Sequence, residues 1–495
     1  MAWNEKKKMK DLVEKTKRFL GSAWRTVWKV GKDDPRKAIH ALKVGFSLTL
    51  VSLLFLLEPV YETLGKNAIM WAVITVVVVF EFTAGATLCK GLNRGYGTFL
   101  ACSLSFIIDY IAKISARVFP AIFIGASVFV IGAAATYIRF LPYIKKNYDY
   151  GVVIFLLTFN MIIVSTYHED EMFKVTRERI YTIAIGCGIC LVMSLFVFPN
   201  WSGEDLHNST ILKLECLANS IEACVNEYFN DAEIEENQEK SVEDPIYKVF
   251  KEVLDSKSSD ETMGLYSSWE PRHSRHYYKY PGQQFVTLGG VLRHFGYTVV
   301  ALHGCLRTEI QTPRSVRAPF KNPCTRLSRE VSKVLMELAN SVRIRHHCSP
   351  EILSNHLQEA LQDLNTTITS RPQLFLGSNM VPLAADQAKH PSGASLSRSK
   401  TDSSGLLKWK TKRVSSFDHQ QQQKEASERK MLRPQLSLEF SEALPFAAFA
   451  SLLVEIVAKL DNVIEAVEEL GRMASFKEFG NGDEIVVNCD TQSPC

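Results

Sequence analysis

Six apolar blocks fill most of the first 200 residues of this 495-residue chain. They run over about 38–57, 68–87, 95–112, 119–139, 149–167 and 179–198. Each is close to the roughly 20 residues that an α-helix needs to cross a bilayer. Only helices and closed barrels satisfy all of their backbone hydrogen bonds in hydrocarbon, so the blocks predict six transmembrane helices. A purely soluble chain is therefore excluded.

The rest of the composition limits the classes of function. Lys plus Arg is 57 and Asp plus Glu is 53, a net charge of +4, which gives no reason to expect a nucleic-acid partner. One close cysteine pair, Cys187 and Cys190, lies inside an apolar block. We interpret these two as small residues on a packing face rather than metal ligands, and we expect reduced thiols and no cofactor.

The charge and helical periodicity divide the chain into parts. Residues 1–43 carry 13 Lys and Arg against five acids, which favours a cytoplasmic N-terminus. After Pro199, apolar residues at helical spacing predict helices at about 205–229, 285–310, 325–348, 350–369 and 439–476. The expected fold class is therefore all-α: a multi-pass membrane protein with six transmembrane helices followed by a helical cytosolic domain. No alternation of strands and helices and no catalytic motif is visible, so we do not expect an enzyme.

Six segments follow from this division. They are a cytosolic amphipathic N-terminal segment (1–37), the transmembrane pore domain (38–199), a cytosolic helical domain (200–384), a disordered linker rich in Ser, Lys and Gln (385–432), a helix that returns to the cytosolic bundle (433–476) and a disordered tail (477–495).

The N-terminal segment has its own apolar pattern. Phe19, Trp24, Val27 and Trp28 recur at helical spacing, which predicts an amphipathic helix. Its Trp side chains would lie at the lipid headgroups. A helix packed on the protein's own cytosolic domain fits the pattern equally well.

Charged residues within or beside the apolar blocks are the main functional signal, because a charge in hydrocarbon is costly and needs a partner or a water-filled path. Glu81 lies in the second block, and we expect it to pair with a nearby Lys or Arg and to hold helix geometry. The surplus is basic, which favours an anion pathway; snorkelling side chains and topology signals are the alternative. The cations are Lys43, Lys90, Arg94, Arg139 and Arg179.

Five stretches of the chain together resemble one family. They are Asp34-Pro35-Arg36, Ile39-His40-Ala41-Leu42-Lys43-Val44-Gly45, Met70-Trp71-Ala72-Val73 running into Val79-Phe80-Glu81-Phe82, Gly85 through Gly95, and Trp269-Glu270-Pro271-Arg272-His273. Over about residues 33–370 the chain resembles the plant aluminium-activated malate transporters. The resemblance implies a homodimeric anion channel with six spans per subunit, which conducts malate and other organic or inorganic anions across the plasma membrane or the vacuolar membrane.

The resemblance also implies roles for single residues. Lys43, Lys90, Arg94 and Arg179 match basic positions that face the pore in the family. Two aromatic residues match positions near the conduction path. These are Trp71 and Phe80.

Aluminium sensing is a separate expectation from the family. Outer carboxylates are the plausible ligands of a trivalent cation, since hard cations need several converging oxygens. Acidic residues that merely solvate an outer loop are the alternative, and we favour it because Lys174 and Arg177 would compete with a bound metal. We therefore expect current without aluminium. The candidate carboxylates are Glu58, Glu62, Glu169, Asp170 and Glu171.

The linker contains Ser399, Ser415 and Ser416 close to basic residues, a pattern typical of kinase substrates; an unmodified tether is the alternative. The expected partners are malate and other anions, a second copy of the chain, the lipid bilayer and cytosolic kinases. Two other functions stay open beside the anion channel. One is a coupled organic-acid efflux carrier with a site closed alternately on each side. The other is a membrane-anchored cytosolic scaffold.

Overall fold

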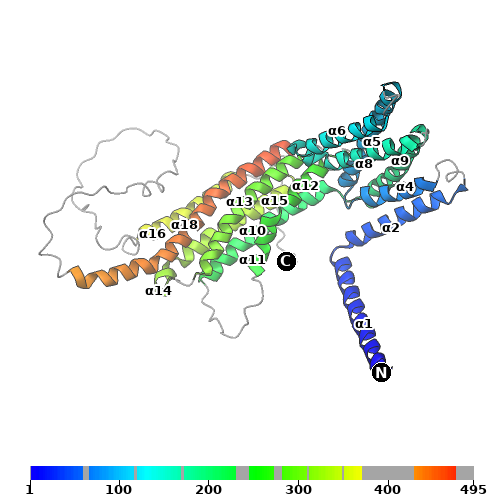
Figure 1. The fold of residues 1–495 in the computed structure, drawn as a ribbon. Helices are drawn as coiled ribbons and strands as arrows, with labels where there is room; N and C mark the ends of the chain where they lie inside the picture. The colour runs from blue at the N-terminus through cyan, green and yellow to red at the C-terminus, as the bar shows by residue number, and fades with distance from the viewer. Residues whose placement is uncertain are drawn as a thin grey trace, which may run out of the picture.

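The computed structural model describes residues 2–58, 66–115, 120–168, 172–229, 245–271, 281–308, 312–347, 350–370, 429–474 and 476. The regular elements within these ranges are all helices, and no β-strand occurs in them (Figure 1). The predicted all-α fold is therefore confirmed.

Eight helices are described before Pro199. They are α1 (Ala2–Asp33), α2 (Pro35–Phe55), α4 (Lys66–Val79), α5 (Ala84–Ser115), α6 (Pro120–Ile138), α7 (Pro142–Asn147), α8 (Asp149–His168) and α9 (Met172–Phe196). We call α2, α4, α5, α6, α8 and α9 the membrane helices, because they cover the six apolar blocks. Among them α2, α5 and α9 are long and apolar enough to cross a membrane, whereas α4, α6 and α8 contain shorter apolar stretches. The chain is thus a membrane protein, and the count of six spans stays a prediction.

A break separates α4 from α5. A continuous helix over 68–87 was expected, and this boundary is wrong because α4 ends at Val79. The backbone that leaves the helix finds other partners: the Thr87 hydroxyl accepts an N–H from the break at 3.1 Å, and the carbonyl of Asn200 accepts the Ala84 N–H at 2.9 Å. Non-helical backbone inside a membrane protein persists only where the protein satisfies it in this way.

The break changes the position of two predicted site residues. Lys90 and Arg94 fall in α5, which begins eleven residues before the predicted third block. Because they are four residues apart, they lie on one face of that helix.

Close packing fixes that face of α5 against α8. A Cβ atom added to Gly97 would lie 2.4 Å from the carbonyl oxygen of Gly151, so the two backbones approach this closely only because Gly97 has no side chain. Ala101 on α5 and Phe159 on α8 are fully buried in the same contact.

The helices after Pro199 form what we call the C-terminal bundle. They are α10 (Ser202–Phe229), α11 (Pro245–Asp255), α12 (Lys257–Ser267), α13 (Gly282–Leu306), α14 (Arg314–Arg317), η1 (Ala318–Phe320), α15 (Lys321–Ile344), α16 (Pro350–Thr369) and α18 (Arg429–Ala474). The five helices predicted for this part are present as α10, α13, α15, α16 and α18. The sequence analysis missed α11 and α12.

Helix α18 runs along α13 and α15 (Figure 1). Both α13 and α18 are long and apolar enough to cross a membrane. Their apolar residues instead fill the bundle core, where Leu288, Phe295, Leu453 and Leu460 are almost completely buried. Burial between helices therefore explains their apolar composition.

A junction joins the membrane helices to the C-terminal bundle. A Cβ atom at Gly85 would lie 2.3 Å from the carbonyl oxygen of Tyr266, so the start of α5 touches the end of α12. The carboxylate of Glu270 accepts the Ser202 N–H at 2.5 Å and caps the N-terminus of α10, where helix N–H groups favour an anion. The Ser202 hydroxyl in turn donates to Thr83 Oγ1 at 2.7 Å, which ties the break to α10.

Candidate functional site: a buried cationic centre

Arg179 lies on α9 with only 8% of its surface exposed. Its guanidinium carbon lies 3.4 Å from the centre of the Trp71 ring on α4, a cation–π stack, and its Nη2 contacts the sulfur of Met161 on α8. The structure thus brings together two residues that the sequence analysis assigned to the conduction path. Stacking fixes the plane of the guanidinium and leaves its N–H edge for other partners.

Arg94 is the second cation of this centre. It lies on α5 and is 4% exposed, and its Nη1 is 3.3 Å from the hydroxyl of Tyr150 on α8. Its Nε has no hydrogen-bond partner among the described residues. Arg94 and Arg179 are close enough for their positive charges to repel each other. Within the described part of the chain neither arginine forms an ion pair.

Buried hydroxyl groups accompany the two arginines. Thr98 and Ser105 on α5, and Thr176 on α9, have side-chain oxygens with no partner in the part of the chain that the structure describes. Thr98 and Ser105 follow Arg94 by four and eleven residues, so all three lie on one face of α5. The sequence analysis missed these hydroxyls; their helical spacing behind Arg94 is the signal that could have found them.

Lys90 carries a compensated charge. Its ammonium pairs with the carboxylate of Glu81, the acid that was expected to find a nearby cation, and it lies 5.9 Å from the ring centre of Tyr150. Lys90 therefore belongs to the same face of α5 as Arg94, but Glu81 offsets its charge.

Two further cations of the predicted pathway already have protein partners. Lys43 is 4% exposed and donates to the carbonyl oxygen of Phe198 at 2.7 Å, so it caps the end of α9, where carbonyl groups favour a cation. Arg139 donates from two nitrogens to the two carboxylate oxygens of Asp149, at 2.7 and 2.9 Å. This bidentate pair is partly exposed and lies between α6 and α8.

The remaining candidates are spread over the chain. Phe80 is buried and packs edge-on against His40 of α2, with ring centres 5.5 Å apart. Glu58 is exposed just beyond the end of α2. The roles of the others stay predictions because these residues lie outside the described ranges: Glu62, Glu169, Asp170, Glu171, Ser399, Ser415 and Ser416.

The chemistry of the centre follows from its donors. Two guanidinium groups with like charge lie among membrane helices, beside hydroxyls that have no protein partner among the described residues. Guanidinium N–H groups match the geometry of a carboxylate, and hydroxyls can also donate to it. The centre is therefore suited to hold or pass an anion.

Comparison with known proteins yields one family. A family model described as aluminium activated malate transporter matches residues 28–471 of the chain. The chain is 57% identical to aluminum-activated malate transporter 12 of Arabidopsis thaliana over 92% of this chain and 89% of that protein. It is 57% identical to transporter 14 of the same name and plant, covering 99% and 95%, and 52% identical to transporter 13, covering 97% and 95%.

Proposed function

Because this chain belongs to the aluminium-activated malate transporter family, we propose that it is an anion channel that lets malate and other organic or inorganic anions flow passively across a plant membrane. Its relatives are named as transporters rather than enzymes, in agreement with the expectation that the chain catalyses no reaction. The observation that carries the proposal is the buried pair of Arg94 and Arg179.

Electrostatics supports an anion as the permeant species. Two like charges in a low-dielectric surrounding repel each other, and each loses hydration on burial. An anion between or beside Arg94 and Arg179 relieves both penalties at once. A dianion such as malate gains twice the Coulomb energy of a monovalent anion at the same distance.

The distribution of donors supports a channel over a carrier. Conduction requires binding that is favourable enough to admit an ion and spread over several sites so that the ion leaves again. On α5 the Arg94 guanidinium is followed by the hydroxyls of Thr98 and Ser105, and on α9 the hydroxyl of Thr176 precedes Arg179 by three residues. Such a row offers successive weak contacts to a moving anion rather than a single closed site.

The proposed assembly is a homodimer. Large apolar side chains on the membrane helices remain exposed in the single chain, among them Phe99, Ile107, Phe129 and Val130. Lipid tails and a second copy of the chain are the partners that bury such surface in a membrane. We place the dimer in the plasma membrane or the vacuolar membrane, with the C-terminal bundle in the cytosol, where kinases reach the linker.

Planar-bilayer recording tests the proposal. The purified full-length chain is reconstituted, and single-channel currents are measured under a malate gradient. We expect currents whose reversal potential follows the malate equilibrium potential. Saturating malate uptake into vesicles without single-channel currents would replace the channel with the coupled carrier. A folded protein that supports neither current nor flux would leave the membrane-anchored scaffold.

A further inference from the structure

The first helix, α1, leaves an apolar face uncovered. Phe19, Trp24, Val27 and Trp28 are 73%, 68%, 65% and 69% exposed. Packing on the chain's own C-terminal bundle, one of the two interpretations of the sequence, is therefore wrong for the single chain. In Figure 1, α1 projects from the start of α2 and lies beside no other labelled helix.

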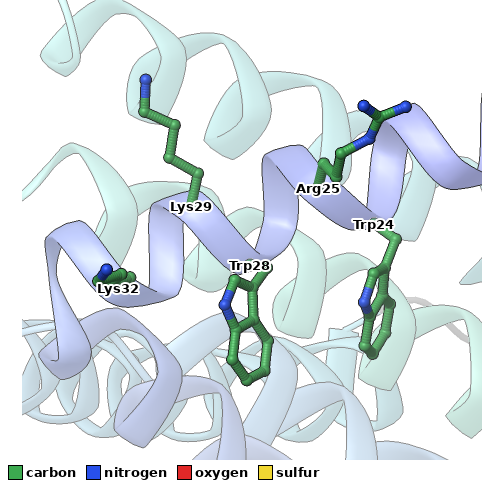
Figure 2. Close-up of a pocket in the computed structure, with 5 residues that line it drawn as sticks. All are labelled: Trp24, Arg25, Trp28, Lys29 and Lys32. Carbon is green, nitrogen blue, oxygen red and sulfur yellow. The ribbon is translucent and has the colours of Figure 1, made fainter.

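The exposed face combines aromatic rings with cations. Trp24 and Trp28 extend from the same side of α1, one turn apart, and Arg25 and Lys29 point the other way in this view (Figure 2). Together with Lys32 these side chains line an open groove of about 530 Å³. Helices that bind at the surface of a membrane combine Trp side chains with Lys and Arg side chains in this way.

The position of α1 in the chain adds a second argument. It ends at Asp33, and α2, the first membrane helix, begins at Pro35. Asp34 has an extended backbone and accepts the Arg36 N–H, so the two helices meet at a cap rather than as one continuous rod. A helix joined by one residue to a membrane-crossing helix is held within reach of the bilayer surface.

The net charge of α1 determines which partner binds to its apolar face. Helix α1 carries ten Lys and Arg against four Asp and Glu, a net charge of +6. A second copy of α1 would be repelled, whereas the anionic lipids of a cytoplasmic leaflet would be attracted. Trp rings prefer the headgroup level of a bilayer, where one side of the ring contacts apolar chains and its N–H contacts water.

We propose that α1 lies on the membrane surface as an interfacial helix, with Trp24 and Trp28 inserted at the headgroup level and Arg25, Lys29 and Lys32 on the phosphates of anionic phospholipids. This membrane-surface site goes beyond the proposed transport function and does not depend on it. Through this site, the lipid composition of the surrounding leaflet determines how firmly α1 holds the first membrane helix at the bilayer surface.

Photo-crosslinking of the full-length chain tests the site. The photoreactive amino acid p-benzoylphenylalanine replaces Trp28, and in a matched control it replaces Thr26, which is exposed and lies about 160° around α1 from Trp28. Each protein is reconstituted in vesicles of phosphatidylcholine, with or without about 30% phosphatidylserine. After illumination, phospholipid adducts are counted by mass spectrometry.

Position 28 should give about fivefold more phospholipid adducts than position 26, and phosphatidylserine should raise its yield about threefold. Replacing Arg25, Lys29 and Lys32 together with Gln should lower the phosphatidylserine effect at least twofold and keep the adducts. Crosslinks from position 28 to a second copy of the chain or to the C-terminal bundle would overturn the proposal. Equal yields at the two positions, or a phosphatidylserine effect that the triple substitution leaves unchanged, would also overturn it.

Discussion

Arg179→Gln removes one positive charge from the buried centre and keeps a polar side chain. In a water-filled path, two unit charges 4 Å apart interact by about 1 kcal/mol, so a malate dianion would lose about 2 kcal/mol and a chloride ion about 1 kcal/mol. These energies correspond to about a 30-fold fall in malate current and about a fivefold fall in chloride current. The preference for malate over chloride should therefore fall about fivefold.

The variant should still fold. Loss of Arg179 removes the stack on Trp71, worth about 0.5–2 kcal/mol, but it also relieves the repulsion from Arg94, and the two effects oppose each other. Arg177→Gln is the matched control, since it makes the same change two residues away on α9, where the side chain is exposed. Arg179→Lys keeps the charge and loses the planar stack, so it should retain most of the charge-dependent preference.

The assay compares malate and chloride currents of wild type and variants in the same reconstituted membranes, scaled to the amount of folded protein. If the free energy lost in the variant is twice as large for malate as for chloride, Arg179 interacts with the permeant ion directly by Coulomb attraction. Equal losses for both anions would mean that Arg179 acts on structure or gating. Unchanged currents would exclude Arg179 from the path.

Four further predictions concern the ion pair of Glu81, a hydroxyl behind Arg94, the cap of α10 and a buried histidine. Glu81→Ala leaves the Lys90 ammonium without its carboxylate, so folded yield and malate current should both fall; full folded yield with altered conductance would instead assign Glu81 to the path. Thr98→Val removes a hydroxyl at nearly constant volume and should lower malate current about fivefold, since one hydrogen bond is worth about 1 kcal/mol; an unchanged current would exclude that hydroxyl. Glu270→Gln should destabilise the protein in thermal unfolding by about 1–2 kcal/mol, because it removes the charge from the α10 cap, and an unchanged unfolding midpoint would contradict this role. Burial, with repulsion from nearby arginines, lowers the pKa of His207 to about 4. The unfolded ring binds a proton below about pH 6.5, so stability should be lost as the pH falls from 6.5 towards 4, by about 2 kcal/mol at pH 5. His207→Gln should reduce this loss in thermal unfolding at pH 7 and 5, and an identical pH dependence would refute the assignment.

Most of the helices could be predicted because their information is local. Apolar blocks of spanning length gave the membrane helices, and apolar residues at helical spacing gave the longer helices of the C-terminal bundle. The helix predicted at 350–369 is observed as α16, Pro350–Thr369, since a proline at its first position marks its start. Helices α11 and α12, of eleven residues each, are too short to show a distinct period.

The break between α4 and α5 could not be predicted from its own residues. The segment Phe80 to Thr83 contains neither glycine nor proline and continues the apolar run of α4. The backbone leaves the helix because partners distant in sequence, Asn200 above all, satisfy its polar groups. A break that depends on a contact between residues more than 100 positions apart has no local signature.

The same limit explains why the five cations could not be ranked from the sequence. The sequence analysis identified five cations within or beside the apolar blocks. Their roles are distinguished only by the groups that they contact in the folded chain. Lys43, Lys90 and Arg139 meet a carbonyl or a carboxylate of the protein. In the described residues, Arg94 and Arg179 meet an aromatic ring, a sulfur and a phenol, none of which carries a negative charge.

That distinction bears on why the two arginines are present. Burying two like charges is unfavourable, and replacing buried charges with well-packed apolar side chains is often neutral or stabilising. A chain that needed Arg94 and Arg179 only to pack its membrane helices would therefore do as well with apolar residues. Local violations of the rules for stability are expected where function requires them. We infer that this pair stabilises the passing anion at the expense of the fold, so replacing both with Met should raise thermal stability while abolishing malate current.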